Sequence, residues 1–370
     1  VGAYNALYVI DHLISGLGTL IEKASGFNDA MVRLQMQGMT GAQTPAAEAA
    51  IFAAAMGTPG RNLEAVGTDL RSLRSVIGIG DPNNGPEAMR VAEAALPHFE
   101  LVQAALAAAT GQTRDSAGDM LTRGVEIAGG AIDPQTGKIS VERFNASLDA
   151  FYKALMAIAP TGKANDLRQP ARQGSMIAKT MEPELFMRMM VAAVIDQGGS
   201  RSGTALQAMG RQLYGGIVSK HTAEEMSRLG LIPKDPYETT SGAGGGRLNK
   251  ESLDKLDADI KGAGGLFGYF DTVVREAMKQ HGITDPQAIT KELFQIMSTD
   301  TGRRMASLFM GNEDQVKKEG TLYDKVPDAA EALRLAGDKS ISFNLSAMTT
   351  SFSNMLQVIE KTNAPAIISI

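Results

Sequence analysis

The sequence predicts an all-α, multi-helix protein in which helical hairpins are joined by Gly- and Pro-rich turns. The first observation is composition: the apolar content lies in Ala, Leu, Ile, Val and 20 Met, while aromatic residues make up only 5%. Ala, Leu and Met are good helix formers. The second observation is that apolar residues recur at helical spacing, and the third is that Gly and Pro clusters separate the periodic segments. The pattern leaves open whether the helices form an elongated arrangement.

Composition and charge limit the classes of function. A chain of 370 residues can form two or three compact units, each with its own core. There is no cysteine, which excludes disulfides and cysteine metal sites. The net charge is −5, both signs are mixed along the chain, and no basic stripe is present. We therefore expect no specific binding of nucleic acid.

Both ends of the chain are apolar. The chain starts at Val1 without an initiator Met or a signal-peptide pattern, and it ends in the run APAIISI. We therefore expect it to be part of a longer protein. The apolar ends and several Ala-rich helix faces also lead us to expect a homo-oligomer.

We expect four regions in chain order. They are an N-terminal helical region at 1–128, a central helical region at 129–232, a flexible linker at 233–249 and a C-terminal helical region at 250–370. The linker contains two prolines and four glycines. These residues are expected to prevent regular structure there, so flexibility should be greatest in this segment.

The N-terminal region is predicted to contain a series of amphipathic helices. One or two helices are expected over 4–36, with apolar positions that include Phe27, Met31, Leu34 and Met36. The next helix, over 44–57, has Thr44 as its expected N-cap and Pro45 in its first turn. Another helix should present one apolar face, formed by Leu63, Val66, Leu70, Leu73 and Ile77.

A turn cluster with the run Asp-Pro-Asn-Asn is expected over 78–85. Two helices should follow, the first from Pro86 through Leu96 and the second from His98 to Ala109. A short helix is predicted over 115–128.

The segment 129–145 resembles a calcium loop only superficially. If Gly137 were the turn glycine, the ligand positions would fall on residues such as Ile132 and Pro134, which cannot bind calcium. We expect a tight turn with a small β-bridge, followed by a helix over 141–158. A polar loop is expected over 159–174.

A helical hairpin within 183–232 organises the central region. An apolar helix is predicted from Leu185 to about Ile195, and a Gly-Gly-Ser turn at 198–200 is expected to end it. The second helix should start near Thr204 and bury Leu206, Met209 and Leu213. Neither helix can bury its apolar stripe alone, so the two should close on each other.

The C-terminal region also predicts helices. Asn249 or Ser252 is expected to cap the first, and Asp285-Pro286 should start another. Helices are also expected over 301–310 and 328–336. The run 340–359 has no charged residue and places its apolar positions on one helical face. We interpret it as an amphipathic packing helix, with a membrane-surface role as the less favoured alternative.

No catalytic, cofactor-binding or metal site is predicted. The four histidines are far apart in sequence: His12, His98, His221 and His281. Neither a Walker loop nor a nucleophile-elbow motif is present. Charged pairs are interpreted as solvated helix faces: Glu224/Glu225, Asp254/Asp257, Arg303/Arg304 and Lys317/Lys318. A water-shielded cluster of ionisable groups in a deep pocket would argue against this interpretation.

Three stretches share a helix–turn–helix pattern. The first is NLEAVGTDLRSLRSVIG with PEAMRVAEAALPHFELVQAALA. The second is MMVAAVIDQGGSRSGTALQAMGRQL with SRLGLIPKD, and the third is QAITKELFQIMSTDTGRRMASLFMGN. Together they resemble the core region of bacteriophage tail tape measure proteins, and they follow that family's order over most of residues 60–310.

The resemblance implies a virion structural protein without enzymatic activity or cofactor. Such a protein lies in the tail lumen, sets tail length during assembly in the host cytoplasm, and leaves when the genome is delivered. The implied partners are tail tube, tail tip and tail assembly chaperone proteins, with transient contact with the host membrane. Two alternatives stay open: a tail-associated cell-wall-degrading enzyme, and a helical interaction module unrelated to phage.

Overall fold

The computed structural model describes residues 26–339, except 59, 79–84, 128–129, 134–135, 160–165, 168–176, 178–180, 239–245 and 312. The described chain is mostly helical, which confirms the predicted all-α class. It divides into two compact units that interleave in sequence. Unit 1 comprises Val1–Thr122, Ala131–Asn145 and Asp328–Ile370, and unit 2 comprises Arg123–Gly130 and Ala146–Pro327. The four regions expected from the sequence are contiguous, and their boundaries stay a prediction.

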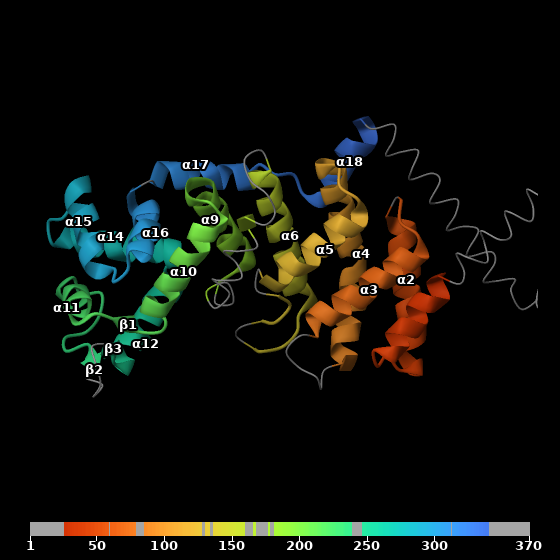
Figure 1. Ribbon diagram of the computed structural model, residues 1–370, viewed down its shortest axis with the longest axis horizontal. Helices are drawn as coiled ribbons and strands as arrows, with labels where there is room; N and C mark the ends of the chain where they lie inside the picture. Colours follow the sequence, from red (N-terminus) through yellow and green to blue (C-terminus); the bar gives the residue numbers. More distant parts are fainter. Residues whose placement is uncertain are drawn as a thin grey trace, which may run out of the picture. The chain divides into compact units, whose positions relative to one another are not determined.

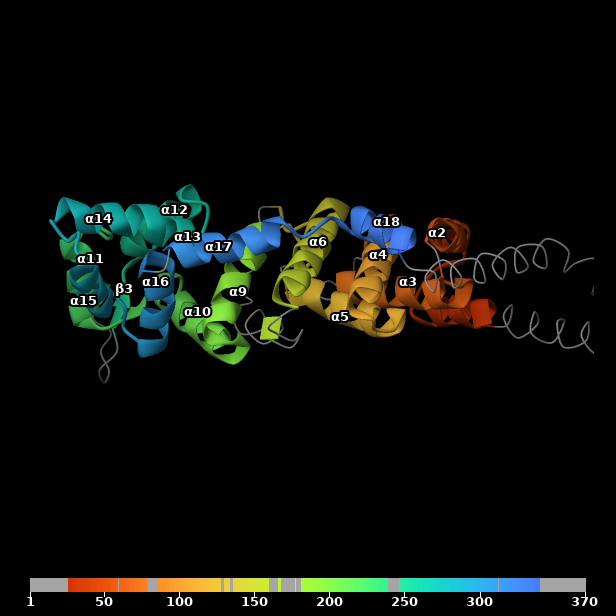
Figure 2. The ribbon, with the colours of Figure 1, turned by 90° about the horizontal axis from the view of Figure 1, so that it is seen from above.

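Unit 1 is built around the long helix α4 (Gly85–Thr110). Helices α2 (Thr44–Gly57), α3 (Leu63–Ile77) and α18 (Ala329–Lys339) all pack against it (Figures 1 and 2). The predicted apolar face of α3 is confirmed, since its five residues are at most 2% exposed. Asn62 caps this helix, because its side chain accepts a hydrogen bond of 2.8 Å from the Ala65 N–H.

Helix α4 is longer than the sequence analysis predicted. Two helices were expected, with a break at Pro97, but one continuous helix contains this proline. A proline inside a helix costs a backbone hydrogen bond and introduces a steric clash. Here Leu96 and Phe99 are fully buried on either side of it. Packing against three neighbouring helices therefore outweighs the local cost of the proline.

Two N-terminal details also differ from the predictions. A short 3₁₀ helix, η1 (Gly41–Gln43), leads directly into α2, so Thr44 is the first residue of α2 and not its N-cap. In the helical segment 26–36, Phe27, Met31 and Leu34 are buried as expected, but Met36 is 82% exposed. Met36 is the last residue of that helical segment, and the next buried apolar residue is Met39.

Helices α5 (Arg114–Ile127) and α6 (Val141–Ile158) start in unit 1 and end in unit 2. An isolated β-bridge joins Ile132 to Ile139 between them, which confirms the predicted small bridge. The apolar face expected for 141–158 is also confirmed, with these residues buried: Phe144, Leu148, Phe151, Leu155 and Ile158.

In unit 2, helices α9 (Pro183–Gln197) and α10 (Gly199–Leu213) form the predicted hairpin. Only Gly198, with φ of 78°, lies between the two helices. The expected start near Thr204 is therefore wrong, because the helix already begins at Gly199. Gly199 has no room for a side chain, since a Cβ there would lie 2.2 Å from the Asp166 carbonyl oxygen. The Ser202 hydroxyl closes the hairpin by donating a 2.8 Å hydrogen bond to the Ala193 carbonyl.

The predicted linker contains regular structure. Strands β1 (Ile217–Val218), β2 (Tyr237–Glu238) and β3 (Gly246–Leu248) form an antiparallel sheet in the order β1-β3-β2. The expectation that 233–249 holds no regular element is therefore wrong for β2 and β3. Pro236 directly precedes β2 and does not interrupt it, and its carbonyl accepts a 2.8 Å hydrogen bond from the Asn249 N–H.

Of the remaining helices of unit 2, α11 lies between β1 and β2 in the sequence, and the others come after β3. They are α11 (Lys220–Arg228), α12 (Lys250–Gly262), α13 (Leu266–Gly268), the π-helix η2 (Tyr269–Val274), α14 (Arg275–Gln280), α15 (Pro286–Ile296), α16 (Asp300–Gly311) and α17 (Glu313–Asp324). Asn249 caps α12 and Asp285 caps α15, as predicted. Figure 1 shows α17 running past α9 and α16, and it contacts both.

Some predictions lie outside the described residues: the helix over 4–25, most of the turn cluster, most of the polar loop and the segment 340–359. None of the helices in the described part combines the length and the hydropathy that a membrane span requires.

Candidate functional site

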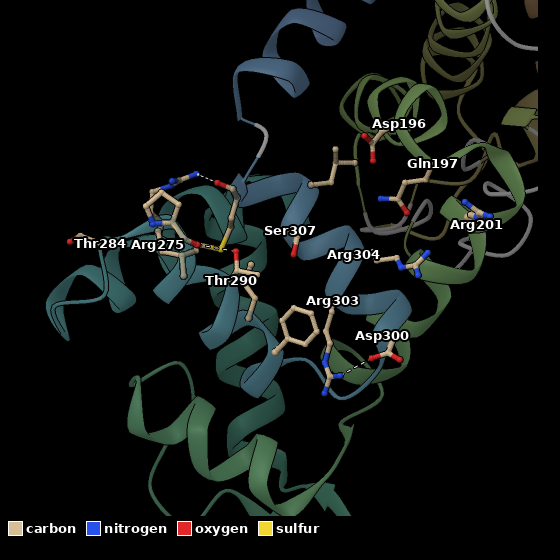
Figure 3. Close-up of a pocket in the computed structure, with 16 residues that line it drawn as sticks. Asp196, Gln197, Arg201, Arg275, Thr284, Thr290, Asp300, Arg303, Arg304 and Ser307 are labelled. Atoms are coloured by element: carbon tan, nitrogen blue, oxygen red, sulfur yellow. Dashed lines mark hydrogen bonds and ion pairs between the residues drawn. The ribbon is translucent and has the colours of Figure 1, made fainter.

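A pocket of about 960 Å³ lies within unit 2. It is formed by the end of α9, the start of α10, the start of α14, the helices α15 and α16, and the turn before α15 (Figure 3). This volume falls within the range of about 300–1,000 Å³ that is usual for ligand sites. We call this pocket the arginine groove, because four arginines line it: Arg201, Arg275, Arg303 and Arg304.

Arg303 is fixed in the groove by three contacts. Its Nε donates a 2.9 Å hydrogen bond to the Met297 carbonyl, and Nη1 lies 2.7 Å from an oxygen of Asp300. Its guanidinium lies 5.1 Å from the centre of the Phe294 ring. Arg303 was expected on a solvated face, but its side chain is only 27% exposed. The fixed guanidinium covers one face of Phe294 and gives the groove a preorganised positive charge.

Arg275 follows the π-helix directly. Its Nη2 donates to the Met310 carbonyl at 3.1 Å and pairs with Asp271 at 3.1 Å, while Nε donates to the Asp271 carbonyl at 3.2 Å. A π-helical turn adds a residue to the helix and redirects the side chains that follow it. In Figure 3 Arg275 and Thr284 lie at one end of the groove, away from Arg303 and Asp300.

Arg201 and Arg304 are exposed. Within the part of the chain that the structure describes, neither side chain forms an ion pair or a hydrogen bond. Arg201 also occupies the first turn of α10, where the helix dipole disfavours a cation. Neither arginine therefore has an evident role in stabilising the fold.

The rest of the polar lining is mixed. It consists of two aspartates, Asp196 and Asp300, the amide residue Gln197, and three hydroxyl residues, Thr284, Thr290 and Ser307. Its described lining contains no histidine or lysine to act as a general base. Among all described residues, no group of three or more acidic or histidine side chains is placed to hold a metal ion.

A second group of charges lies in unit 1, and its central members are buried. We call it the Arg61 cluster: Arg61, Asp69, Glu100, Gln103, Arg114 and Asp115. Arg61 donates to Asp69 through Nε at 3.2 Å and also through Nη2, and its Nη1 lies 2.6 Å from Asp115. Its Nε lies 3.6 Å from Glu100. The Gln103 amide donates to Asp69 at 3.3 Å, so the cluster links α3, α4 and the start of α5.

Burial dominates the electrostatics of this cluster. Glu100 has no exposed surface, and neither of its carboxylate oxygens accepts a hydrogen bond. Burial raises the pKa of Glu100 well above its ordinary value, the charge of Asp69 raises it further, and Arg61 opposes both effects. Burial likewise lowers the pKa of Arg114 to about 10, although the charge of Glu100 opposes this shift. Glu100 is therefore the group that carries a proton most readily.

The sequence analysis missed this cluster. A group of buried ionisable residues was not expected, but Arg61, Asp69 and Glu100 form one, with the exposed Asp115 at its edge. Because Glu100 is fully buried, a substrate has no access to its carboxyl group in this conformation. The signal that could have found it is a single acidic residue inside the apolar run PHFELVQAALA. A lone charge on a buried helix needs a buried partner.

The charged residues weighed in the sequence analysis are scattered. His221 Nε2 lies 2.5 Å from Gln295, and the His281 ring bonds the Ala277 carbonyl at 2.9 Å; both histidines are exposed. Glu225 pairs with Arg228 at 2.6 Å, and Asp257 with Lys261 at 2.6 Å. Of the singled-out pairs, only Arg303 and Arg304 enter the groove.

Comparison with protein-family models, curated proteins and solved structures finds no match to this chain.

Proposed function

We propose that this chain is a tape measure-like structural protein of a bacteriophage tail, which takes part in tail assembly, tail length determination and genome delivery. The proposal rests on the three resembling stretches. The first corresponds to α3 and α4, the second to the end of α9, α10 and the residues after α11, and the third to α15 and α16. Each stretch contains a pair of helices that contact each other, as a packing unit would require.

The observation that carries the proposal is the packing of the second stretch against the third. Helix α10 packs along α16. The buried Gln212 amide donates a 2.6 Å hydrogen bond to the Ile296 carbonyl and accepts one of 2.9 Å from the Ser298 N–H. Arg228 and Glu292 add an ion pair of 2.5 Å. Two stretches that are separated in sequence therefore pack into one unit, and the residues that join them serve packing.

The core of unit 2 fits a protein that changes its packing. Methionine recurs among its buried side chains: Met187, Met189, Met190, Met209, Met226, Met278, Met297, Met305 and Met310. Methionine is flexible and adapts to different neighbours. A protein that leaves the tail lumen during genome delivery would benefit from such a core.

Deletion of the gene in the source prophage tests the proposal. Particles induced from the deletion strain should lack tails of normal length, and a plasmid copy should restore them. Electron microscopy of negatively stained particles measures the length distribution. Tails of unchanged length in the deletion strain would contradict the proposal.

The cell-wall-degrading alternative is favoured by one observation, the two aspartates in the arginine groove. A gel with embedded cell-wall material separates the two functions. We expect no clearing by the intact chain. Clearing that is lost in Asp196→Asn or Asp300→Asn, with the fold unchanged by circular dichroism, would favour the enzyme.

A further inference from the structure

We propose that the arginine groove of unit 2 binds an acidic amphipathic helix of a partner protein. The proposal stands on the groove alone and is independent of the tail function. Its first support is charge. Four arginines face two aspartates in the lining, whereas the whole chain carries a net charge of −5.

The second support is the state of the four guanidinium groups. Arg303 and Arg275 are held by Asp300, Asp271 and backbone carbonyls, so they are positioned without further ordering. Arg201 and Arg304 are exposed, and neither pairs with a described residue. Arg201 and Arg304 are therefore available to pair with the carboxylates of a ligand. Arg275 and Arg303 are already ordered, so they lose little conformational entropy when a ligand binds.

The third support is the apolar part of the lining, which contains Ile289, Leu293, Phe294, Leu308 and Met310. Leu293, Leu308 and Met310 are buried, but Phe294 is 46% exposed. An exposed aromatic residue in a pocket is typical of a surface that receives an apolar anchor. An amphipathic helix with apolar residues at positions i, i+3 or i+4 and i+7, flanked by Glu or Asp, matches both features.

Single-stranded nucleic acid fits the groove less well. Binding of single strands without sequence preference relies on aromatic faces on which bases stack. The described lining holds one aromatic residue, Phe294, and Arg303 already covers one face of its ring. The groove therefore offers little stacking surface to nucleic acid bases.

Fluorescence anisotropy with the full chain tests the proposal. The probes are a labelled 16-residue helix that carries Leu at helical spacing and Glu elsewhere, the same peptide with Lys in place of Glu, and a 16-base DNA strand. The variant is Arg201→Glu with Arg304→Glu. The control is Arg211→Glu with Arg247→Glu, which makes the same charge change at two exposed residues of unit 2 outside the groove.

We expect the acidic helix to bind and the basic helix and DNA not to bind. The groove variant should weaken binding by on the order of 10-fold or more, and the control by less than about 3-fold. Phe294→Ala should also weaken it. Absence of acidic-helix binding by the unchanged chain, an equal loss in the control, or DNA binding that depends on Arg201 and Arg304 would each overturn the proposal. Circular dichroism of every variant checks that the fold is retained.

Discussion

The Arg61 cluster and the arginine groove use the same residue types in opposite ways. In unit 1, Arg61 is 7% exposed at its side chain and contacts three carboxylates. In unit 2, Arg201 and Arg304 are exposed and contact none among the described residues. Removal of an arginine from the first group leaves buried charges uncompensated, whereas removal from the second leaves only a solvated helix surface. Whether an arginine stabilises the fold or is available to bind a ligand therefore depends on its burial and its ion-pair partners, not on the residue type.

The largest effect is expected for Arg61→Ala. This change leaves the buried Asp69 without its cation, which should lower the free energy of unfolding by about 3–5 kcal/mol. Urea unfolding, with hydrogen exchange of the α3 and α4 amides, measures it. The matched control is Arg90→Ala, since Arg90 is 73% exposed at its side chain and pairs only weakly with Glu87 at 3.9 Å. If both variants lost the same free energy of unfolding, burial would not explain the role of Arg61.

The next largest expected effect is a dependence of the unfolding free energy on pH, which arises from Glu100. Its pKa is raised above the ordinary 4.5 in the folded protein, so the folded state keeps a proton that the unfolded state releases. The unfolding free energy should therefore fall as pH rises from about 4.5 toward the raised pKa, by at most about 1.4 kcal/mol per pH unit.

Glu100→Gln removes this titration while it keeps the shape of the neutral side chain. The variant should gain stability over the unchanged chain as pH rises through that window. Denaturation at a series of pH values gives the difference between the two proteins. A difference that does not change with pH would show that Glu100 does not hold the proton.

An intermediate effect is expected for a buried neutral group. Gln212→Ala leaves the Ile296 carbonyl and the Ser298 N–H without their partners. Unpaired buried groups cost about 1–3 kcal/mol. Gln207→Ala, at an exposed position of the same helix, should change stability by less than about 0.5 kcal/mol. If both changes had the same effect, burial would not decide the role of a polar side chain in unit 2.

The smallest effect is expected for Arg201→Ala. This residue opposes the dipole of α10, so its removal should leave thermal stability unchanged or raise it by a few tenths of a kcal/mol. Arg211 lies in the last turn of the same helix, where the dipole favours a cation. Arg211→Ala should therefore lower stability slightly. A clear loss of stability with Arg201→Ala would mean that Arg201 stabilises the fold, in contradiction to its assignment as a binding residue.

Local patterns predicted the helices well. The apolar faces of α3 and α6, the hairpin of α9 and α10, and the caps Asn249 and Asp285 were all expected. Each depends on residues close in sequence, so helical spacing and side-chain capping suffice to find it.

The errors occur where contacts from distant residues decide the structure. Packing of α4 against three helices keeps it continuous through Pro97. Strand β1 pairs with β3 across the predicted linker and orders its end. The Arg61 cluster and the arginine groove join residues from several helices, so a single sequence does not show which residues meet. For the Arg61 cluster, the lone acidic Glu100 in an apolar run indicates only that a buried partner exists.

Mass spectrometry of phage tail particles purified from the organism that encodes this chain tests the proposed tail function most directly. The account predicts that peptides from both units copurify with the tail tube and are lost when the tube does not assemble. Intact, functional tails in which no peptide of this chain is present would contradict it.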